Sequence, residues 1–142
     1  PNCRISGAIF DGALKLVGFV ATGENTVSKT LTAWDIDLYW EALKLLPADY
    51  RVAVEWVDSQ GQTWARSDEM PLGASYPMSR WQARQVLRHP VRLSLPNPIP
   101  PGTYEIHVMV YDPRQGVLLN VTAPHHETRQ GRVILGKVTV HD

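Results

Sequence analysis

The segment WDIDLYWEA, residues 34–42, alternates large apolar and polar side chains, and this period of two constrains the fold more than any other feature of the chain. Successive side chains on a β-strand point to opposite faces, so residues two apart share a face. The apolar face carries Trp34, Ile36, Leu38 and Trp40, and the polar face carries Asp35, Asp37, Tyr39 and Glu41. The segment is therefore predicted to be a strand with a core on one side and water on the other.

The acidic side chains of this segment also permit a catalytic interpretation. Residues two apart on one face lie about 6 to 7 Å from each other, and carboxyl pairs about 6.5 to 9.5 Å apart occur in inverting glycosidases. However, any amphipathic strand with acids on its outer face has this spacing. No pattern marks the burial that would raise the pKa of one carboxyl for general-acid catalysis. We therefore predict that these carboxylates form the solvated face of a strand.

Similar segments recur along the chain and predict a fold made almost entirely of strands. Runs rich in β-branched and aromatic residues are separated by turn dipeptides, and only the short WEALKLLPAD resembles a helix. Strands are expected at residues 4–10, 13–21, 30–41, 50–58, 62–68, 86–95, 103–111, 117–122 and 132–141. Their expected core residues include Val52, Val54, Trp56, Val91, Leu93, Leu95, Tyr104, Ile106, Val108 and Val110. The prediction is an antiparallel β-sandwich of eight to nine strands with immunoglobulin-like or jelly-roll connectivity.

The connections between these strands carry turn signals. DSQGQ at residues 58–62 and DPRQG at residues 112–116 each begin with Asp and contain Gly, which predicts two hairpins. Residues 69–85 carry Pro, Gly and Ser without sustained alternation, so they are expected to cross between the sheets as a long surface connection. LPNPIPPG at residues 95–102 has four prolines, which predicts a stiff link into the next strand.

Length and charge narrow the functional classes. The 142 residues fit a single domain, residues 1–142, and no stretch approaches the roughly 20 continuous apolar residues of a membrane span. The 14 basic and 14 acidic residues are dispersed and cancel, so nucleic acid is not an expected partner. The start PNCRIS lacks an initiator Met, which is expected of a fragment of a longer protein or of a processed terminus. The single cysteine, Cys3, is expected to be a free thiol.

Residue types that commonly carry catalysis are present, but not in catalytic arrangements. His125, His126 and Glu127 are adjacent, so their side chains diverge, and the HExxH or spaced-histidine pattern of a zinc site is absent. Two further histidines, His89 and His107, lie on separate expected strands, with His107 facing outward. No P-loop, GxGxxG or CxxC motif occurs. The sequence therefore predicts no catalytic residue, no cofactor site and no metal site.

Aromatic residues outside the expected core are the remaining candidates for ligand contact. Trp64 lies on the return of the first hairpin, and Tyr76 and Trp81 lie in the long crossover. A flat ring stacks on the apolar face of a sugar while nearby polar groups bind its hydroxyls. Loop tryptophans are also commonly buried in the core, so a structural role for Trp64 and Trp81 is the alternative. If a ligand surface exists, we expect it at a rim formed by Trp64, Tyr76 and Trp81.

Three segments, in this order, resemble a known family: PADYRVAVEWVDSQGQTWARSDEMP, YPMSRW and LSLPNPIPPGTYEIHVMVYDPRQGVLL. They are similar to the bacterial extracytoplasmic C-terminal domains of membrane glycosyltransferases of the dolichyl-phosphate-mannose mannosyltransferase type, and to related uncharacterised membrane proteins. The likeness covers roughly residues 10–141. One departure is WQARQV, where such domains commonly place a Gly-Glu turn after the Trp. The family's transferase chemistry belongs to its membrane portion, so no catalytic residue carries over.

The resemblance and the residues together lead to one expected function and two alternatives. We expect a non-catalytic accessory domain, located outside the cytoplasmic membrane and tethered to it through a parent protein, that binds a glycan or a lipid-linked sugar. The first alternative is a protein-interaction or spacer module without a small-molecule ligand. The second is a small hydrolase. A β-sandwich can serve all three purposes, so the fold does not choose between them.

Overall fold

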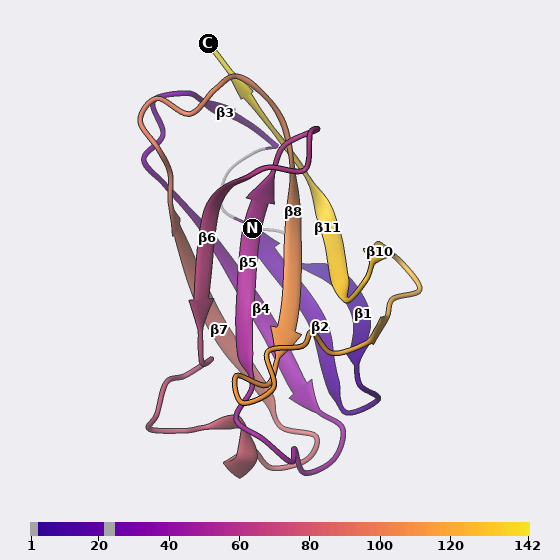
Figure 1. Cartoon of the computed structure of the whole chain (residues 1–142). Helices are drawn as coiled ribbons and strands as arrows, with labels where there is room; N and C mark the ends of the chain where they lie inside the picture. The colour runs from indigo at the N-terminus through magenta and orange to yellow at the C-terminus, as the bar shows by residue number, and fades with distance from the viewer. Residues whose placement is uncertain (1–2, 22–24) are drawn as a thin grey trace.

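The computed structural model describes residues 3–21 and 25–142, which form two β-sheets packed face to face (Figure 1). Sheet A consists, in spatial order, of β7 (Val86–Ser94), β4 (Ala33–Ala42), β2 (Leu14–Ala21), β1 (Arg4–Phe10) and β9 (Val121–Thr122). Sheet B consists of β10 (Glu127–Arg129), β11 (Arg132–His141), β8 (Gly102–Tyr111), β5 (Arg51–Val57) and β6 (Thr63–Glu69). A further strand, β3 (Thr26–Ser28), pairs in parallel with β11.

The β-sandwich predicted from the sequence is confirmed. The described residues form eleven strands rather than eight or nine, because the short strands β3 and β10 were not expected. Each of these two has three residues, which is too few to show an alternating pattern. The helical element of the described residues is a single 3-10 turn, η1 (Met78–Arg80). Within the same residues, no helix is long and apolar enough to cross a membrane.

The core lies between the two sheets and follows the alternation read from the sequence. All four apolar residues of the 34–40 segment are at most 3% exposed. Trp34 of sheet A meets Trp56 of sheet B edge to face, with ring centroids 5.4 Å apart, and Trp56 contacts Tyr104 at 5.6 Å. Large aromatic side chains therefore join the two layers in the core, near one end of these strands.

The acidic side chains of the same segment lie on the outer face of sheet A, as predicted. Asp35 accepts two hydrogen bonds from Arg92 on the neighbouring strand β7, at 2.7 and 2.9 Å. Asp37 pairs with Arg88 of β7 at 3.1 Å. The hydrogen bond from Arg92 lowers the pKa of Asp35, which is opposite to the change that a general acid needs. These carboxylates belong to a cross-strand charge ladder on an exposed surface.

The first expected hairpin is confirmed, and the second is only partly formed. The Asp58 N–H donates to the Gln62 carbonyl at 2.9 Å, and Gly61 has a φ of 81°, which closes the turn between β5 and β6. After the Asp112–Gly116 turn, the chain makes one bridge to β8 and then pairs with β1 as strand β9 of sheet A. β11 and β5 occupy the two edges of β8 along most of its length, so the following segment pairs with β8 only at its C-terminal end.

Candidate functional site

The three aromatic residues that the sequence singles out do not form one surface. Trp81 is 0% exposed and belongs to the core, and its indole N–H donates to the Tyr76 carbonyl at 3.0 Å. A ring enclosed on both faces has no surface on which a sugar can stack. We therefore correct the expectation for Trp81. The crossover folds back over the end of the sandwich, and this ring closes the core there.

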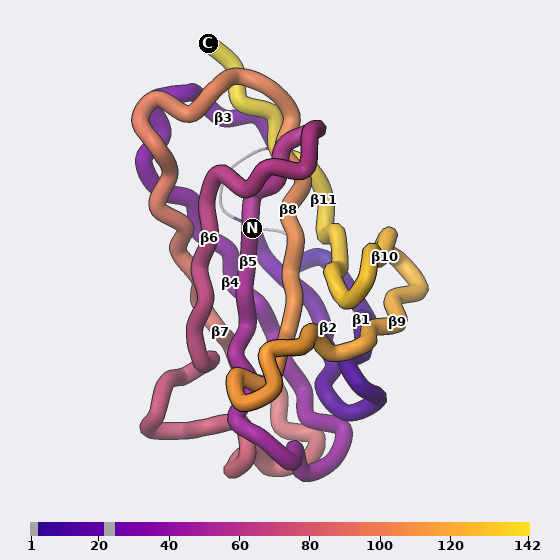
Figure 2. Tube along the Cα trace, in the orientation of Figure 1, coloured from indigo at the N-terminus to yellow at the C-terminus, as the bar shows by residue number. Residues whose placement is uncertain are grey.

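The other two aromatic residues lie at opposite ends of the molecule. Trp64 follows the β5–β6 hairpin at one end of β6, and Tyr76 belongs to the crossover that leaves the other end (Figures 1 and 2). The seven residues of β6 separate these ends by about 20 Å. Tyr76 is half-buried, and its hydroxyl donates to Gln85 Oε1 at 2.7 Å. The single rim expected from the sequence is therefore not present.

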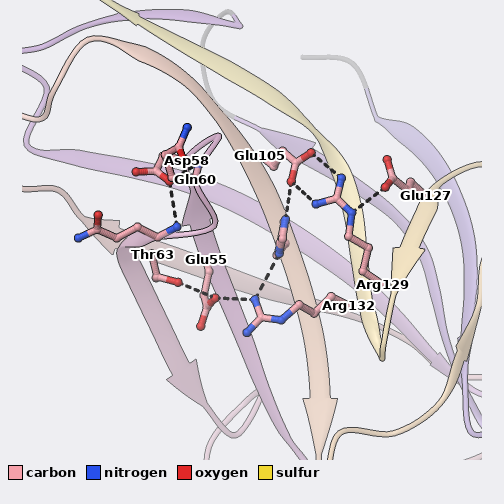
Figure 3. Close-up of polar contacts among 10 residues, drawn as sticks. Glu55, Asp58, Gln60, Thr63, Glu105, Glu127, Arg129 and Arg132 are labelled. Atoms are coloured by element: carbon pink, nitrogen blue, oxygen red, sulfur yellow. Dashed lines mark hydrogen bonds and ion pairs between the residues drawn. The ribbon is translucent and has the colours of Figure 1, made fainter.

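A concave polar surface lies elsewhere, on the outer face of sheet B. It is a groove of about 620 Å³ between the β5–β6 hairpin, the middle strands β8 and β11, and the short strand β10. Trp64 lies beside this groove, because its indole N–H donates at 2.8 Å to a carboxylate oxygen of Asp58, which lines it. Figure 3 shows the polar contacts in this region. The charged and ionisable lining residues are Asp58, Glu105, His107, Arg129, Arg132 and Lys137.

The alternation of the strands places these side chains outward. On β8, Ile106 and Val108 face the core, so Glu105 and His107 face the groove. The sequence predicts the outward orientation of His107, but it does not identify Arg132 as its neighbour. That contact depends on the pairing of β8 with β11, which joins residues far apart in the chain. Strand alternation is therefore the sequence signal for the groove residues. It predicts the face on which each residue lies, but not its neighbours on other strands.

Glu55 lies beside the groove and binds two of its lining residues, Thr63 and Arg132. Its side chain is 4% exposed although it lies on the outer face of β5, because arginine side chains cover it. It accepts hydrogen bonds from Arg132 at 2.7 Å, from Thr63 at 3.1 Å and from Arg66. Burial raises the pKa of Glu55, but Arg132 and Arg66 outweigh burial and leave that pKa below its usual range. The result is a buried carboxylate that stays ionised and fixes the arginines around it.

A second cluster lies on the far wall of the groove. Arg129 binds both carboxylate oxygens of Glu105, at 2.9 and 3.0 Å, and also donates to Glu127 at 2.7 Å. His107 joins the two clusters, because its Nε2 lies 3.0 Å from Glu105 Oε1 and its Nδ1 lies 3.3 Å from Arg132 Nη1. A guanidinium group only donates, so Nδ1 accepts and Nε2 carries the proton that Glu105 accepts.

The electrostatics of these carboxylates do not suit acid–base catalysis. The hydrogen bond from Arg129 is the main cause that lowers the pKa of Glu105. The hydrogen bond from the Trp64 indole is the main cause that lowers the pKa of Asp58. A glycosidase needs one carboxyl whose pKa is raised so that it can donate a proton near neutral pH. The carboxylates here are held as anions, so the arrangement fits binding by charge and hydrogen bonding.

One of the two adjacent histidines, His126, has structural contacts. His126 Nε2 lies 3.0 Å from the hydroxyl of the buried Ser6, and its ring centroid is 6.1 Å from that of Phe19. Burial is the main cause that lowers the pKa of His126. In the residues that the structure describes, no three His, Cys, Asp or Glu side chains gather in a way that could hold a metal ion. His126 therefore ties its loop to the edge of sheet A.

Comparison with known proteins identifies a shared fold. No family profile and no curated protein sequence matches the chain. The C-terminal domain of wzt aligns with 96% of this chain and 78% of its own, at 10% identity and a TM-score of 0.55. A beta-glucuronidase from glycoside hydrolase family 2 aligns with 74% of the chain at 13% identity and a TM-score of 0.50, and the chain spans 10% of that protein's length. At these identities the two matches show a common β-sandwich fold.

Proposed function

We propose that this protein is a non-catalytic accessory module that binds carbohydrate in the groove on the outer face of sheet B. The observation that carries the proposal is the set of charged side chains which hold one another in place along rigid strands. Arg132, for example, is fixed by Glu55 and by His107 before any ligand arrives. Binding groups that are already ordered lose little conformational entropy when a ligand binds, so they can recognise a polar, flexible molecule.

The carboxylates in and beside the groove support binding rather than hydrolysis. Glu55 and Glu105 both have lowered pKa values, because arginine side chains donate to them. A hydrolase built from this pair would lack the protonated member that must donate to the leaving group. We therefore prefer the binding role to the small-hydrolase alternative.

The exposed apolar side chains give less support to the protein-interaction alternative. Among the described residues, the large exposed apolar side chains are those of Ile5 on β1, Val86 on β7, and Leu45 and Val117 in two different connections. A protein-binding surface more commonly presents one contiguous apolar patch of several hundred Å². The groove, in contrast, concentrates charged groups at one place. Carbohydrate is the ligand class that best fits an open polar groove on a β-sandwich, an architecture that lectin domains also use.

The placement of this module in a larger protein is part of the proposal. Its support is the sequence resemblance, which implies a domain attached to a membrane glycosyltransferase and located outside the cytoplasmic membrane. The solved structures that match at low identity support the fold of the module. In such a protein, a binding groove would hold a glycan or a lipid-linked sugar near a catalytic portion that lies in another part of the chain.

A groove-filling variant tests the proposal. Thr103 is exposed and lines the groove, so Thr103→Trp is expected to block ligand entry without touching the Glu55 network. The matched control is Ser94→Trp, which adds the same ring at an exposed position of β7 in sheet A. Calorimetric titration with a panel of neutral and acidic oligosaccharides should show binding to the unaltered chain and to Ser94→Trp, and a loss of at least tenfold for Thr103→Trp. Equal binding by both variants would place the ligand elsewhere, and no binding across the panel would contradict the proposal.

A further inference from the structure

The hydrogen-bond acceptors of the groove are already occupied by the protein. Asp58 accepts from two backbone N–H groups of its own turn, both at 2.9 Å, and from the Trp64 indole at 2.8 Å. Glu105 accepts two hydrogen bonds from Arg129 and one from His107. An incoming hydroxyl group would therefore find few carboxylate oxygens to which it could donate.

The donors of the groove are only partly used. Arg132 makes its two contacts through Nη1, which leaves the Nε and Nη2 N–H groups without a partner among the described residues. Arg129 donates once from each of its three nitrogens, so one further N–H on each terminal nitrogen has no partner in the same part of the chain. Both guanidinium groups can therefore donate outward while they keep the contacts that hold them.

Lys137 is a third cationic side chain in the groove, and its ammonium group is a further hydrogen-bond donor. It is exposed, it lines the groove, and it lies directly opposite Glu105 in the pairing of β11 with β8. Arg129 and His107 already occupy that carboxylate. Lys137 forms no ion pair or hydrogen bond with any residue that the structure describes. An unpaired ammonium group beside two arginines raises the local attraction for an anion.

From this imbalance we infer that the groove selects an acidic saccharide, whose carboxylate binds to Lys137 and to the outward N–H groups of Arg132 and Arg129. The inference rests on the carbohydrate binding proposed above and specifies its class. A neutral hydroxyl brings a donor with every acceptor, whereas a carboxylate brings acceptors only. A uronic acid residue supplies such a carboxylate on a sugar ring, and charge-assisted hydrogen bonds from arginine and lysine are stronger than neutral ones.

A matched pair of ligands tests this inference with the unaltered chain. The probes are trisaccharides of galacturonic, glucuronic and mannuronic acid, each compared with its own methyl ester, which keeps the ring hydroxyls and removes the charge. Calorimetry at low salt should show that at least one acid binds ten times more tightly than its ester, and that added salt reduces this difference. Sodium phosphate is a third probe, because it tests whether the groove binds any anion.

Substitutions of single lysines test whether Lys137 binds the carboxylate of the ligand. Lys137→Ala should lower the affinity for the acid about tenfold and leave the affinity for the ester unchanged, whereas Lys137→Arg should restore most of the loss. Lys44→Ala is the matched control, since Lys44 is also exposed and has no partner among the described residues, but lies in the β4–β5 loop. Thermal unfolding of each variant within a few degrees of the unaltered chain confirms that the fold is kept.

The outcomes separate the two proposals. Equal affinity for acid and ester would overturn the selection for charge but keep the carbohydrate-binding function. Phosphate binding as tight as that of the acid would also overturn the inference, because the groove would then be a general anion site. A loss caused equally by Lys44→Ala and Lys137→Ala would place the anion outside the groove. Absence of binding by every saccharide would contradict the proposed function itself.

Discussion

Replacing Arg132 with methionine is expected to destabilise the protein by about 1.5 to 3 kcal/mol, the usual contribution of a hydrogen bond to a buried charged group. The change removes the 2.7 Å hydrogen bond to Glu55, whose side chain is 4% exposed, and the contact with His107. The loss should stay below the roughly 3 to 5 kcal/mol of a fully broken buried ion pair, because Arg66 still binds Glu55. Methionine keeps much of the apolar contact of the arginine stem.

Urea denaturation followed by tryptophan fluorescence at neutral pH measures this loss as a change in the midpoint at constant slope. The control is Arg92→Met, since the Arg92–Asp35 pair is exposed and should contribute less than about 1 kcal/mol. The double variant of Arg132→Met with Glu55→Gln should cost less than the sum of the single changes, because the uncompensated charge is also removed. Equal small losses for Arg132→Met and Arg92→Met, with additive behaviour in the double variant, would refute the claim that Glu55 organises the groove.

Other parts of the structure give three further tests by chemical denaturation. Trp40→Ala should cost about 3 to 5 kcal/mol because the ring is fully buried, whereas Asp37→Ala should cost under about 1 kcal/mol; equal losses would contradict the strand register. Trp56→Phe should lower the free energy of unfolding less than Trp40→Phe does. The Trp56 indole N–H has no hydrogen-bond partner among the described residues, whereas that of Trp40 donates to His89 at 3.2 Å. A larger loss for Trp56→Phe would contradict this reasoning. Burial lowers the pKa of His89 below its usual 6.5, so the folded state favours the neutral ring; stability should fall as the pH decreases from about 6.5, and the fall should be smaller in His89→Gln. An identical pH dependence in His89→Gln would show that His89 does not contribute.

The sandwich could be predicted from the sequence because strand alternation is a local signal. The alternation from Trp34 to Trp40 predicts which face of this strand packs against the core, and the structure confirms that prediction. The Asp112–Gly116 turn shows where this local reasoning ends. The turn forms as expected, but the following strand joins the opposite sheet, because β8 already has a neighbour on each edge. The sheet that a strand joins depends on its pairing with distant strands, so it cannot be predicted from a short segment of sequence.

The groove was not predicted, because it depends on contacts between distant residues. Glu55, His107 and Arg132 lie on three strands, and 77 residues separate the first from the last. Each looks like an ordinary outward polar residue in its own segment. The prediction for Trp81 failed for a related reason: the sequence places it in a connection, but the connection folds over the open end of the core and buries the ring.

The most direct test of the proposed binding site is an NMR titration of the 142-residue chain with the acidic trisaccharide that binds best in calorimetry. If the ligand occupies the groove, the largest backbone shifts should fall at Thr103, Glu105 and Lys137, and the Trp64 indole N–H should move with its partner Asp58. The spectrum of the saccharide should remain that of the intact trisaccharide after prolonged incubation. Largest shifts in the crossover around Tyr76, or cleavage of the saccharide, would contradict a non-catalytic carbohydrate site on the outer face of sheet B.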